Sequence, residues 1–301
     1  MNCAIIGSTK IAEVHAEQLI KSGVKEITFI SRSIKKRKKI ISNIRKKVSK
    51  RILFTHSNLK ILKKNTYKFV CICSKTEVHD KHLMEVLKLK SIIIVEKPII
   101  SLLKFKNKYI NFLTKIYKKN KKIVVCYPYL FLAKSFKKFS SPIQKINKIN
   151  FEFQTGGNAT FKKICINLMP HALSFFHIFL NKEFLKKKII INNSQVKKSL
   201  WQTSFKTGEI IINLIFKENY QKKTSLKLTI NNLLLIRKTK KNKGKFINFI
   251  HNYKTKKNRI IKNPMAEFYK DLTRNTNNQK YFRNNRNITF DIMKKNNFFL
   301  N

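Results

Sequence analysis

The sequence predicts an α/β protein of two domains: an N-terminal domain built on a parallel sheet, and a C-terminal α+β domain with a largely antiparallel sheet. Short apolar segments alternate with amphipathic helical patterns as far as residue 126, which is typical of a parallel sheet with crossover helices. Beyond that point several β-rich segments follow one another. A length of 301 residues also suits two domains better than one. We therefore expect domains at residues 1–126 and 127–301.

The first strand, residues 3–6, runs into the turn Gly7-Ser8-Thr9-Lys10-Ile11-Ala12 and then into an amphipathic helix. A strand, tight turn and helix in this order is typical of a Rossmann fold, whose turn offers backbone N–H groups to a pyrophosphate. Thr9 and Ala12 replace the second and third glycines of the G-x-G-x-x-G fingerprint, and the Thr9 side chain is expected to weaken or rearrange the contact. The residues expected to bind a dinucleotide here are Gly7, Ser8, Thr9 and Ile11.

The second strand, residues 26–30, ends in Ser31 and Arg32, at the distance expected for contact with the adenosine ribose. An acidic residue at this point would bond the ribose hydroxyls of NAD, whereas a hydroxyl and a cation suit a 2′-phosphate. The pair therefore favours NADP over NAD as the cofactor. The alternative is that Arg32 is one more solvated cation in a very basic chain.

The strand at residues 92–96 ends in Glu96-Lys97-Pro98, and the strand before it, residues 69–73, runs into a turn that spans Ser74 to His79. Parallel strands deliver their carboxyl ends to the crevice where α/β proteins bind ligands, so a charged pair locked by proline at this place indicates chemistry. The alternative is that Pro98 only ends the ladder of hydrogen bonds.

The pattern changes after the strand at residues 123–126. Residues 149–154 alternate with period two, and residues 209–216 and 224–230 are further β-rich segments. One helix, near residues 165–180, interrupts them. Strands that follow one another without helices indicate an antiparallel sheet.

These elements together resemble the Gfo/Idh/MocA family of oxidoreductases, which includes glucose-fructose oxidoreductase and inositol dehydrogenase. The resemblance spans nearly the whole chain, and Glu-Lys-Pro in its strand context is its most specific part. The segments that carry it are Gly7 with His15, Ser31-Arg32, Ser74 to His79, Glu96-Lys97-Pro98, Tyr127-Pro128-Tyr129, Asn167-Leu168-Met169-Pro170-His171, and Asn263 to Tyr269. It implies hydride transfer between NADP (or NAD) and a sugar, sugar-nucleotide or polyol substrate.

The resemblance also implies roles for single residues. His171 would face the nicotinamide as acid and base, while Lys97 would hold the substrate oxygen and the nicotinamide ribose. Asn167 stands one helical turn before His171, where the family has an acidic residue; an amide can bond a substrate hydroxyl but cannot stabilise an imidazolium. Tyr127 is expected to line the substrate pocket or to close the hinge. Further residues expected beside the dinucleotide are Ser74, His79 and Glu96.

Three of these assignments have simpler alternatives. A single histidine on an apolar helix is more often a core residue, which applies to His171, and His79 could merely bond backbone groups. His15 is expected to cap or pack near the cofactor rather than to react. The family resemblance also implies that two copies of the chain pair through the sheet of the second domain.

The formal net charge of +53 requires that a nucleic-acid partner be considered. However, the cations recur in every segment, and only nine of the 67 basic residues are arginine, the residue preferred for phosphate clamps. We therefore expect no specific nucleic-acid binding. The densest basic runs are expected to be the outer face of a helix at residues 35–39 and a hairpin loop at residues 238–243.

The sequence shows no secretory or membrane-spanning segment, and its most apolar helix is too short to span a bilayer. The five cysteines show no Cys-x-x-Cys spacing, which favours reduced core residues in a cytoplasmic protein and no metal site.

Three classes of function stay open: an NADP-dependent oxidoreductase, a catalytically silent family member that acts as a sensor or assembly partner, and a basic nucleic-acid binder on an enzyme fold. The first is favoured. The departures at Thr9 and Asn167 keep the second open.

Overall fold

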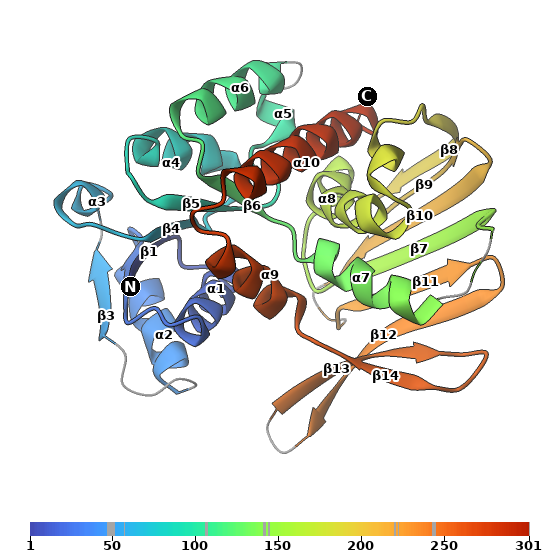
Figure 1. Cartoon of the computed structure of the whole chain (residues 1–301), viewed down its shortest axis with the longest axis horizontal. Coiled ribbons are helices and arrows are strands. Elements are labelled where there is room, and N and C mark those ends of the chain that lie inside the picture. Colours follow the sequence, from blue (N-terminus) through green and yellow to red (C-terminus); the bar gives the residue numbers. More distant parts are fainter. Residues whose placement is uncertain are drawn as a thin grey trace. The chain divides into compact units, whose positions relative to one another are not determined.

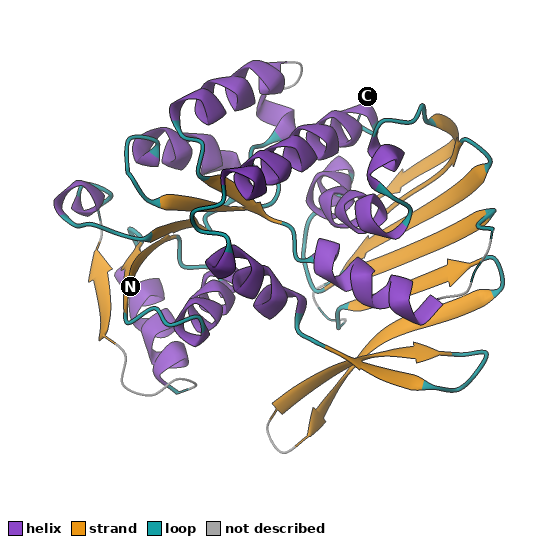
Figure 2. Ribbon diagram, in the orientation of Figure 1, coloured by secondary structure: helices purple, strands orange, loops and turns teal. Residues whose placement is uncertain are grey.

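The computed structural model describes residues 1–46, 52–56, 58–105, 108–140, 143, 145–219, 221, 223–242 and 245–300. The chain divides into two compact units, each with its own sheet (Figures 1 and 2). The first unit comprises Met1–Cys126 with Met265–Phe290, and the second comprises Tyr127–Pro264 with Asp291–Asn301.

The first unit contains a six-stranded parallel sheet in the order β3-β2-β1-β4-β5-β6, which confirms the predicted Rossmann-type fold. Its strands form because short apolar runs are buried on both faces, as the fully buried residues 69–72 of β4 illustrate. The bounds are β1 Asn2–Ile6, β2 Glu26–Ile30, β3 Ile52–His56, β4 Phe69–Ile72, β5 Ile92–Glu96 and β6 Ile123–Cys126.

Helices cover both faces of this sheet, with α1 and α2 on one face and α4 and α6 on the other (Figure 1). The basic run at residues 35–39 lies in α2, where its four lysines face outward as predicted, whereas Arg37 of the same run is buried on the face of Ile40 and Ile44. Val48, which continues the helical spacing of these isoleucines, lies outside the described residues. The helices are α1 Lys10–Lys21, α2 Ile34–Arg45, α3 Ile61–Lys64, η1 Thr76–Val78, α4 His79–Val86, α5 Leu102–Phe105 and α6 Tyr109–Lys119.

The end of the chain contributes α9, Pro264–Arg274, and α10, Gln279–Phe298. Residues 265–290 belong to the first unit, although the predicted division at residue 126 assigned them to the second domain. Buried contacts explain this: Tyr269 bonds His15, and the Asn285 side chain bonds the backbone of Val125 in both directions, at 2.9 and 3.1 Å. A single boundary in the sequence cannot describe a unit that consists of two separate segments of the chain.

The second unit contains an eight-stranded sheet in the order β14-β13-β12-β11-β7-β10-β9-β8. Every neighbouring pair is antiparallel except β7 and β10, which are parallel, so the prediction of a largely antiparallel sheet is confirmed. The strands are β7 Lys148–Thr155, β8 Ile190–Lys197, β9 Leu200–Thr207, β10 Ile210–Glu218, β11 Ser225–Ile230, β12 Leu233–Asn242, β13 Lys245–Asn252 and β14 Asn258–Ile261.

One face of this sheet packs on helices α7, Tyr129–Ser140, and α8, Lys162–Phe179, while η3, Lys182–Leu185, follows α8. The alternating pattern of β7 directs Phe151 inward, where its ring lies 5.3 Å from both Phe175 and Phe176. This aromatic cluster buries the apolar side of the sheet and fixes α8, the helix that carries Asn167 and His171.

The basic run at residues 238–243 does not form the predicted loop. Residues 238–242 continue strand β12, whose ladder with β13 extends to the pair Asn242 and Lys245, while residue 243 lies outside the described part. Lysine stems tolerate an exposed strand because their cations stay in water, and the pairing with β13 outweighs the poor strand propensity of lysine.

Among the described residues, no helix is long and apolar enough to cross a membrane. All five cysteines are buried and unpaired, as predicted.

Candidate functional site

The candidate site of the first unit lies at the carboxyl edge of the parallel sheet, beside β1 and β4, where the strand order reverses. Gly7 follows β1 with a φ of +114°. A Cβ atom on Gly7 would lie 2.7 Å from the carbonyl oxygen of Cys73, so only glycine lets this turn approach the end of β4.

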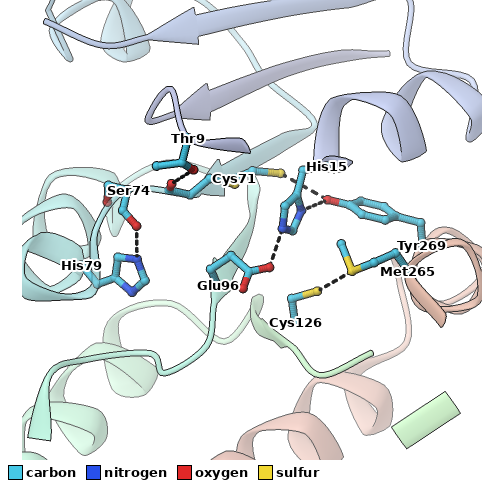
Figure 3. A network of polar contacts seen from close by, with 10 residues as sticks. Thr9, His15, Cys71, Ser74, His79, Glu96, Cys126, Met265 and Tyr269 are labelled. Atoms are coloured by element: carbon cyan, nitrogen blue, oxygen red, sulfur yellow. Dashed lines mark hydrogen bonds and ion pairs between the residues drawn. The ribbon is translucent and has the colours of Figure 1, made fainter. Parts of the chain in front are cut away.

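Thr9 lies at the N-cap of α1 but does not cap it. Its hydroxyl donates instead to the carbonyl oxygen of Cys73 at 2.9 Å (Figure 3), so the Thr9 side chain leaves the helix N-terminus uncapped. The threonine that replaces the second glycine is therefore turned toward β4. The amide groups of the first turn of α1 keep the arrangement that binds anions at helix N-termini.

The end of β2 is tied to this turn. The Ser8 and Ser31 hydroxyls lie 2.9 Å apart, and the backbone N–H of Gly7 donates to Ile30. Arg32 is exposed directly after Ser31. The guanidinium of Arg37, in the first turns of α2, donates to the carbonyl oxygen of Ser31.

The turn after β4 is held by two histidines. The Ser74 hydroxyl and His82 Nδ1 lie 2.8 Å apart. His79 is 1% exposed, and its two ring nitrogens each lie 3.0 Å from a carbonyl oxygen, that of Ser74 and that of Pro98. Burial lowers the pKa of His79, so the neutral ring donates to one of these oxygens at a time. Because both nitrogens face carbonyl oxygens of the turn, the His79 side chain lies inside the turn and supports it from there.

The Glu96 side chain is hydrogen-bonded to His15. His15 Nε2 lies 2.6 Å from Glu96 Oε1, and His15 Nδ1 lies 2.5 Å from the Tyr269 hydroxyl (Figure 3). The tyrosine hydroxyl in turn lies 3.7 Å from Cys71 Sγ. His15 is fully buried and the Glu96 side chain is 12% exposed, so this chain of polar groups is shielded from water.

The pKa values of this pair move apart. Burial by itself would raise the pKa of Glu96, but the hydrogen bond and charge of His15, together with Lys97, lower it. Burial would likewise lower the pKa of His15, yet the polar groups packed around its ring, first Cys73 and then Tyr269, raise it well above its usual value. Both shifts favour a carboxylate on Glu96 and an imidazolium on His15.

Three potential metal ligands also meet here, since donor atoms of His15, Glu96 and Cys126 lie within 4.8 Å of one another. The direct bond between His15 and Glu96 fills the space between two of these atoms, and the Cys126 thiol points to Met265 Sδ at 3.6 Å. The arrangement is satisfied as a hydrogen-bonded network.

Lys97 therefore sits between two neighbours that buried histidines hold: Glu96 through His15, and Pro98 through His79. The Lys97-Pro98 peptide bond is cis, and Lys97 is half-buried. Because both neighbouring residues are fixed, the backbone at Lys97 is fixed as well, and this limits the directions that its side chain can take. A group that must meet a reacting atom requires such positioning.

In the second unit, His171 and Asn167 lie one turn apart on α8 and are both half-buried. The His171 ring packs 4.4 Å from the ring of Tyr129 and 5.4 Å from that of Phe153. Tyr127, two residues before Tyr129, is 1% exposed. Aromatic packing thus fixes the plane of the imidazole.

Three residues at these sites have no predicted role. His82 could have been found, since it lies one turn after His79. Arg37 was expected on the outer face of its helix, although its spacing to Ile40 and Ile44 places it on the buried face. Tyr269 could not be assigned a role because its partner His15 lies 254 residues earlier in the chain.

The fold and this edge define the class of protein: a Rossmann fold for dinucleotides joined to an α+β unit. Residues 1–127 match the Gfo/Idh/MocA family model, which describes an oxidoreductase family with an NAD-binding Rossmann fold. This match over the N-terminal 127 residues confirms the predicted resemblance to the oxidoreductase family.

Solved structures of the same fold cover the whole chain. One is a mutant of KijD10, a 3-ketoreductase from Actinomadura kijaniata, in complex with TDP-benzene and NADP: it is 9% identical, with a TM-score of 0.72 over 98% of this chain and 95% of that one. A dehydrogenase (MviM) from Clostridium difficile is 13% identical, with a TM-score of 0.66 and coverage of 98% and 97%. A Gfo/Idh/MocA family oxidoreductase from Vibrio cholerae is 12% identical, with a TM-score of 0.63 and coverage of 97% and 94%. None of the curated proteins matches the sequence.

The residues at the sheet edge fit a dinucleotide. The close approach of Gly7 to Cys73 and an N-terminus of α1 that Thr9 does not cap suit a pyrophosphate, and a hydroxyl next to a cation after β2 suits a ribose with a 2′-phosphate.

Gly7→Ala tests the close approach. We expect this variant to lower the free energy of unfolding by about 1–3 kcal/mol more than Gly23→Ala, because both glycines have positive φ but only the first meets backbone atoms under 3.0 Å. Urea unfolding of both variants measures the difference. Equal losses would contradict the requirement for glycine at this turn.

The pair of His15 and Glu96 predicts a pH dependence of stability. The lowered pKa of Glu96 contributes stability above about pH 4.5, which is lost as the pH falls through its folded value. The raised pKa of His15 contributes fully below about pH 6.5, and its share is lost as the pH rises through its folded value. Both groups therefore contribute their full stabilisation between about pH 4.5 and about pH 6.5.

His15→Gln should therefore cost most stability inside this window, about 3–5 kcal/mol, and less at about pH 8.5. Urea unfolding of wild type and variant measures the cost at each pH, and His56→Gln in β3 is the control. A cost that does not change with pH would contradict the ion pair.

Proposed function

We propose that the protein is an NADP-dependent oxidoreductase that transfers a hydride between the nicotinamide and a secondary alcohol or ketone of a sugar, sugar-nucleotide or polyol substrate. The observation that carries this proposal is the Glu96-Lys97-Pro98 turn, held by His15 and His79 at the carboxyl edge of an NAD-binding Rossmann fold.

The first domain, proposed as residues 1–126, would bind the dinucleotide. Backbone groups of the turn after β1 would hold the pyrophosphate, while Ser31 and Arg32 would hold the 2′-phosphate of the adenosine ribose. Ser74 and Glu96 would border the nicotinamide half. His79, whose nitrogens both face carbonyl oxygens, would contribute by fixing the turn at Ser74.

The chemistry is assigned to Lys97 and His171. The bound nicotinamide supplies or accepts the hydride. The Lys97 ammonium would polarise the substrate oxygen, and the His171 imidazole would give or take the hydroxyl proton. Asn167 would bond a neighbouring substrate hydroxyl, and Tyr127 would line the pocket of the second domain, proposed as residues 127–301. Since Asn167 leaves His171 without a carboxylate one turn away, the imidazolium would be less stabilised than in relatives with an acid there.

Two observations support the proposed substrate class: the similarity to a solved 3-ketoreductase and the positive charge of the chain. KijD10 is a 3-ketoreductase whose structure contains TDP-benzene and NADP. A keto-sugar linked to a nucleotide would also suit a chain of charge +53, because its phosphates are drawn to a basic surface.

We also propose that two copies of the chain pair through the sheet of the second unit. The face of the sheet opposite Phe151 carries neutral side chains, including Asn150, Gln202 and Asn213, around a depression of about 250 Å³, and the ion pair of Glu152 with Lys217 lies on the same face beside them. Neutral side chains at the centre with charged side chains around them are typical of the core and rim of an interface.

Lys97→Ala tests the catalytic assignment. We expect wild type to bind NADPH saturably, and more tightly than NADH or ATP at about physiological salt, where screening weakens general attraction to the basic surface. The variant should keep NADPH binding and lose at least about 100-fold in kcat, because the group that polarises the substrate oxygen is gone. Calorimetry measures binding, and NADPH oxidation with a panel of keto-sugar nucleotides measures kcat.

The exposed Lys88, changed to alanine, provides the control for the loss of one positive charge. NADPH binding no tighter than ATP would contradict the proposed function. Binding without turnover of any tested substrate in wild type would favour the catalytically silent alternative.

Asn213→Arg tests the pairing. Arginines facing each other across a symmetric interface repel, so we expect the variant to sediment as a monomer where wild type sediments as a dimer. Asn111→Arg, on the exposed side of α6, adds the same charge elsewhere and should leave the dimer intact. A monomeric wild type would overturn this proposal.

A further inference from the structure

We infer that Arg237 binds an anionic substituent of the substrate, a carboxylate or a phosphate, and thereby favours sugars that carry such a group over uncharged sugars. This inference rests on the proposed function and deepens it, because Arg237 lies close to His171 in the second unit.

Arg237 interrupts a row of apolar side chains that crosses the sheet from β9 to β13. Residues that lie directly opposite each other in neighbouring strands project to the same face. In strand order the row consists of Trp201, Phe216, Phe153, Leu226, Arg237 and Ile250. The five apolar members are at most 2% exposed, whereas Arg237 is half-buried. Because burial of a charge is costly, an arginine in such a row indicates a function other than packing.

Tyr129 connects this arginine to His171. The ring of Tyr129 lies 4.4 Å from the His171 ring and 5.2 Å from the ring of Phe153, which is two strands, or about 10 Å, from Arg237. Burial raises the pKa of the Tyr129 hydroxyl to about 12, and the guanidinium of Arg237 beside it opposes this rise. The guanidinium and the imidazole are thus separated by one tyrosine side chain, so a single substrate molecule can contact both.

The protein orients the guanidinium of Arg237 without balancing its charge. Its Nη2 donates to Asn248 Oδ1 at 3.3 Å, and the same oxygen accepts from the Thr239 hydroxyl at 2.9 Å. The amide of Asn248 and the hydroxyl of Tyr129 are both neutral at physiological pH. Within the described part of the chain, no carboxylate forms an ion pair with Arg237. A half-buried cation is therefore held in place with no counter-charge from the protein.

A carboxylate or a phosphate on the substrate would balance this charge. The planar guanidinium fork binds either group through two parallel hydrogen bonds. The apolar neighbours strengthen the attraction, because they lower the local dielectric constant. Sugar acids, sugar phosphates and sugar nucleotides supply such a group, whereas an uncharged sugar offers only hydroxyls.

The competing explanation is that Arg237 only supports the Tyr129 hydroxyl. Loss of that support would weaken the binding of charged and uncharged sugars alike, since both would meet the same displaced rings of Tyr129 and His171. Recognition of an anionic group would affect only the charged sugars.

The experiment is calorimetric titration of the protein, saturated with NADP, with glucose, galactose and mannose, each compared with its uronate and its phosphate monoester. At about physiological salt, where general attraction is screened, we expect wild type to bind an anionic member at least about tenfold more tightly than its uncharged counterpart. Preference for the uronates assigns a carboxylate to Arg237, and preference for the phosphate esters assigns a phosphate.

Arg237→Met keeps an apolar stem and removes the charge. We expect this variant to bind both members of each pair within about twofold of each other, and to keep the wild-type Kd for NADPH within about threefold. Lys240→Met is the control, because it removes an exposed charge from the opposite face of the same strand and should leave the preference intact.

Wild type without any preference for the anionic members, or a preference that survives in Arg237→Met, would overturn the inference and leave the proposed function standing. Absence of saturable NADPH binding to wild type would overturn the proposed function itself. A measurement on wild type alone covers the case in which the variant does not fold. The preferred anionic sugar should protect Arg237 from labelling by phenylglyoxal, as detected by mass spectrometry, and its uncharged counterpart should not; equal labelling with both would also overturn the inference.

Discussion

The bond between His15 and Glu96 is the interaction on which the site of the first unit depends. It joins the first helix after the dinucleotide turn to the carboxyl end of β5, and Tyr269 fixes the other ring nitrogen. Because the imidazole is fully buried, neither nitrogen can exchange its partner for water. The position of the backbone that carries Lys97 is therefore set by groups from three distant parts of the sequence.

The same edge shows how a departure from a fingerprint can be accommodated. The threonine at position 9 adds bulk where the G-x-G-x-x-G fingerprint has a glycine, but its hydroxyl bonds the Cys73 carbonyl, so that the side chain is turned toward β4. The first glycine cannot be replaced in this way, because at Gly7 the neighbour is backbone. The first two glycine positions of the fingerprint thus serve different purposes. The first allows a close backbone contact within the protein, and the second, in the usual fingerprint, leaves space for the ligand.

Much of the fold could be predicted from the sequence, because the strands of the first unit are short apolar runs with clear ends; the strands at residues 26–30 and 123–126 have the predicted bounds. The strand at residues 238–242 could not, because its lysines have a loop composition and only pairing with β13 makes it a strand. The proposed site residues follow from motifs in the sequence, whereas the partners that fix them, Tyr269 for His15 and Pro98 for His79, depend on the folded chain.

The return of residues 265–290 to the first unit has a consequence for synthesis of the protein. The ribosome releases the Rossmann sheet early, yet the tyrosine that completes the His15 network and the asparagine that bonds Val125 emerge only after the sheet of the second unit. Until then the nascent sheet exposes a histidine, a carboxyl group and apolar surface that its own sequence cannot cover. The early part of the chain thus stays open to proteases and chaperones until residues 265–290 have emerged.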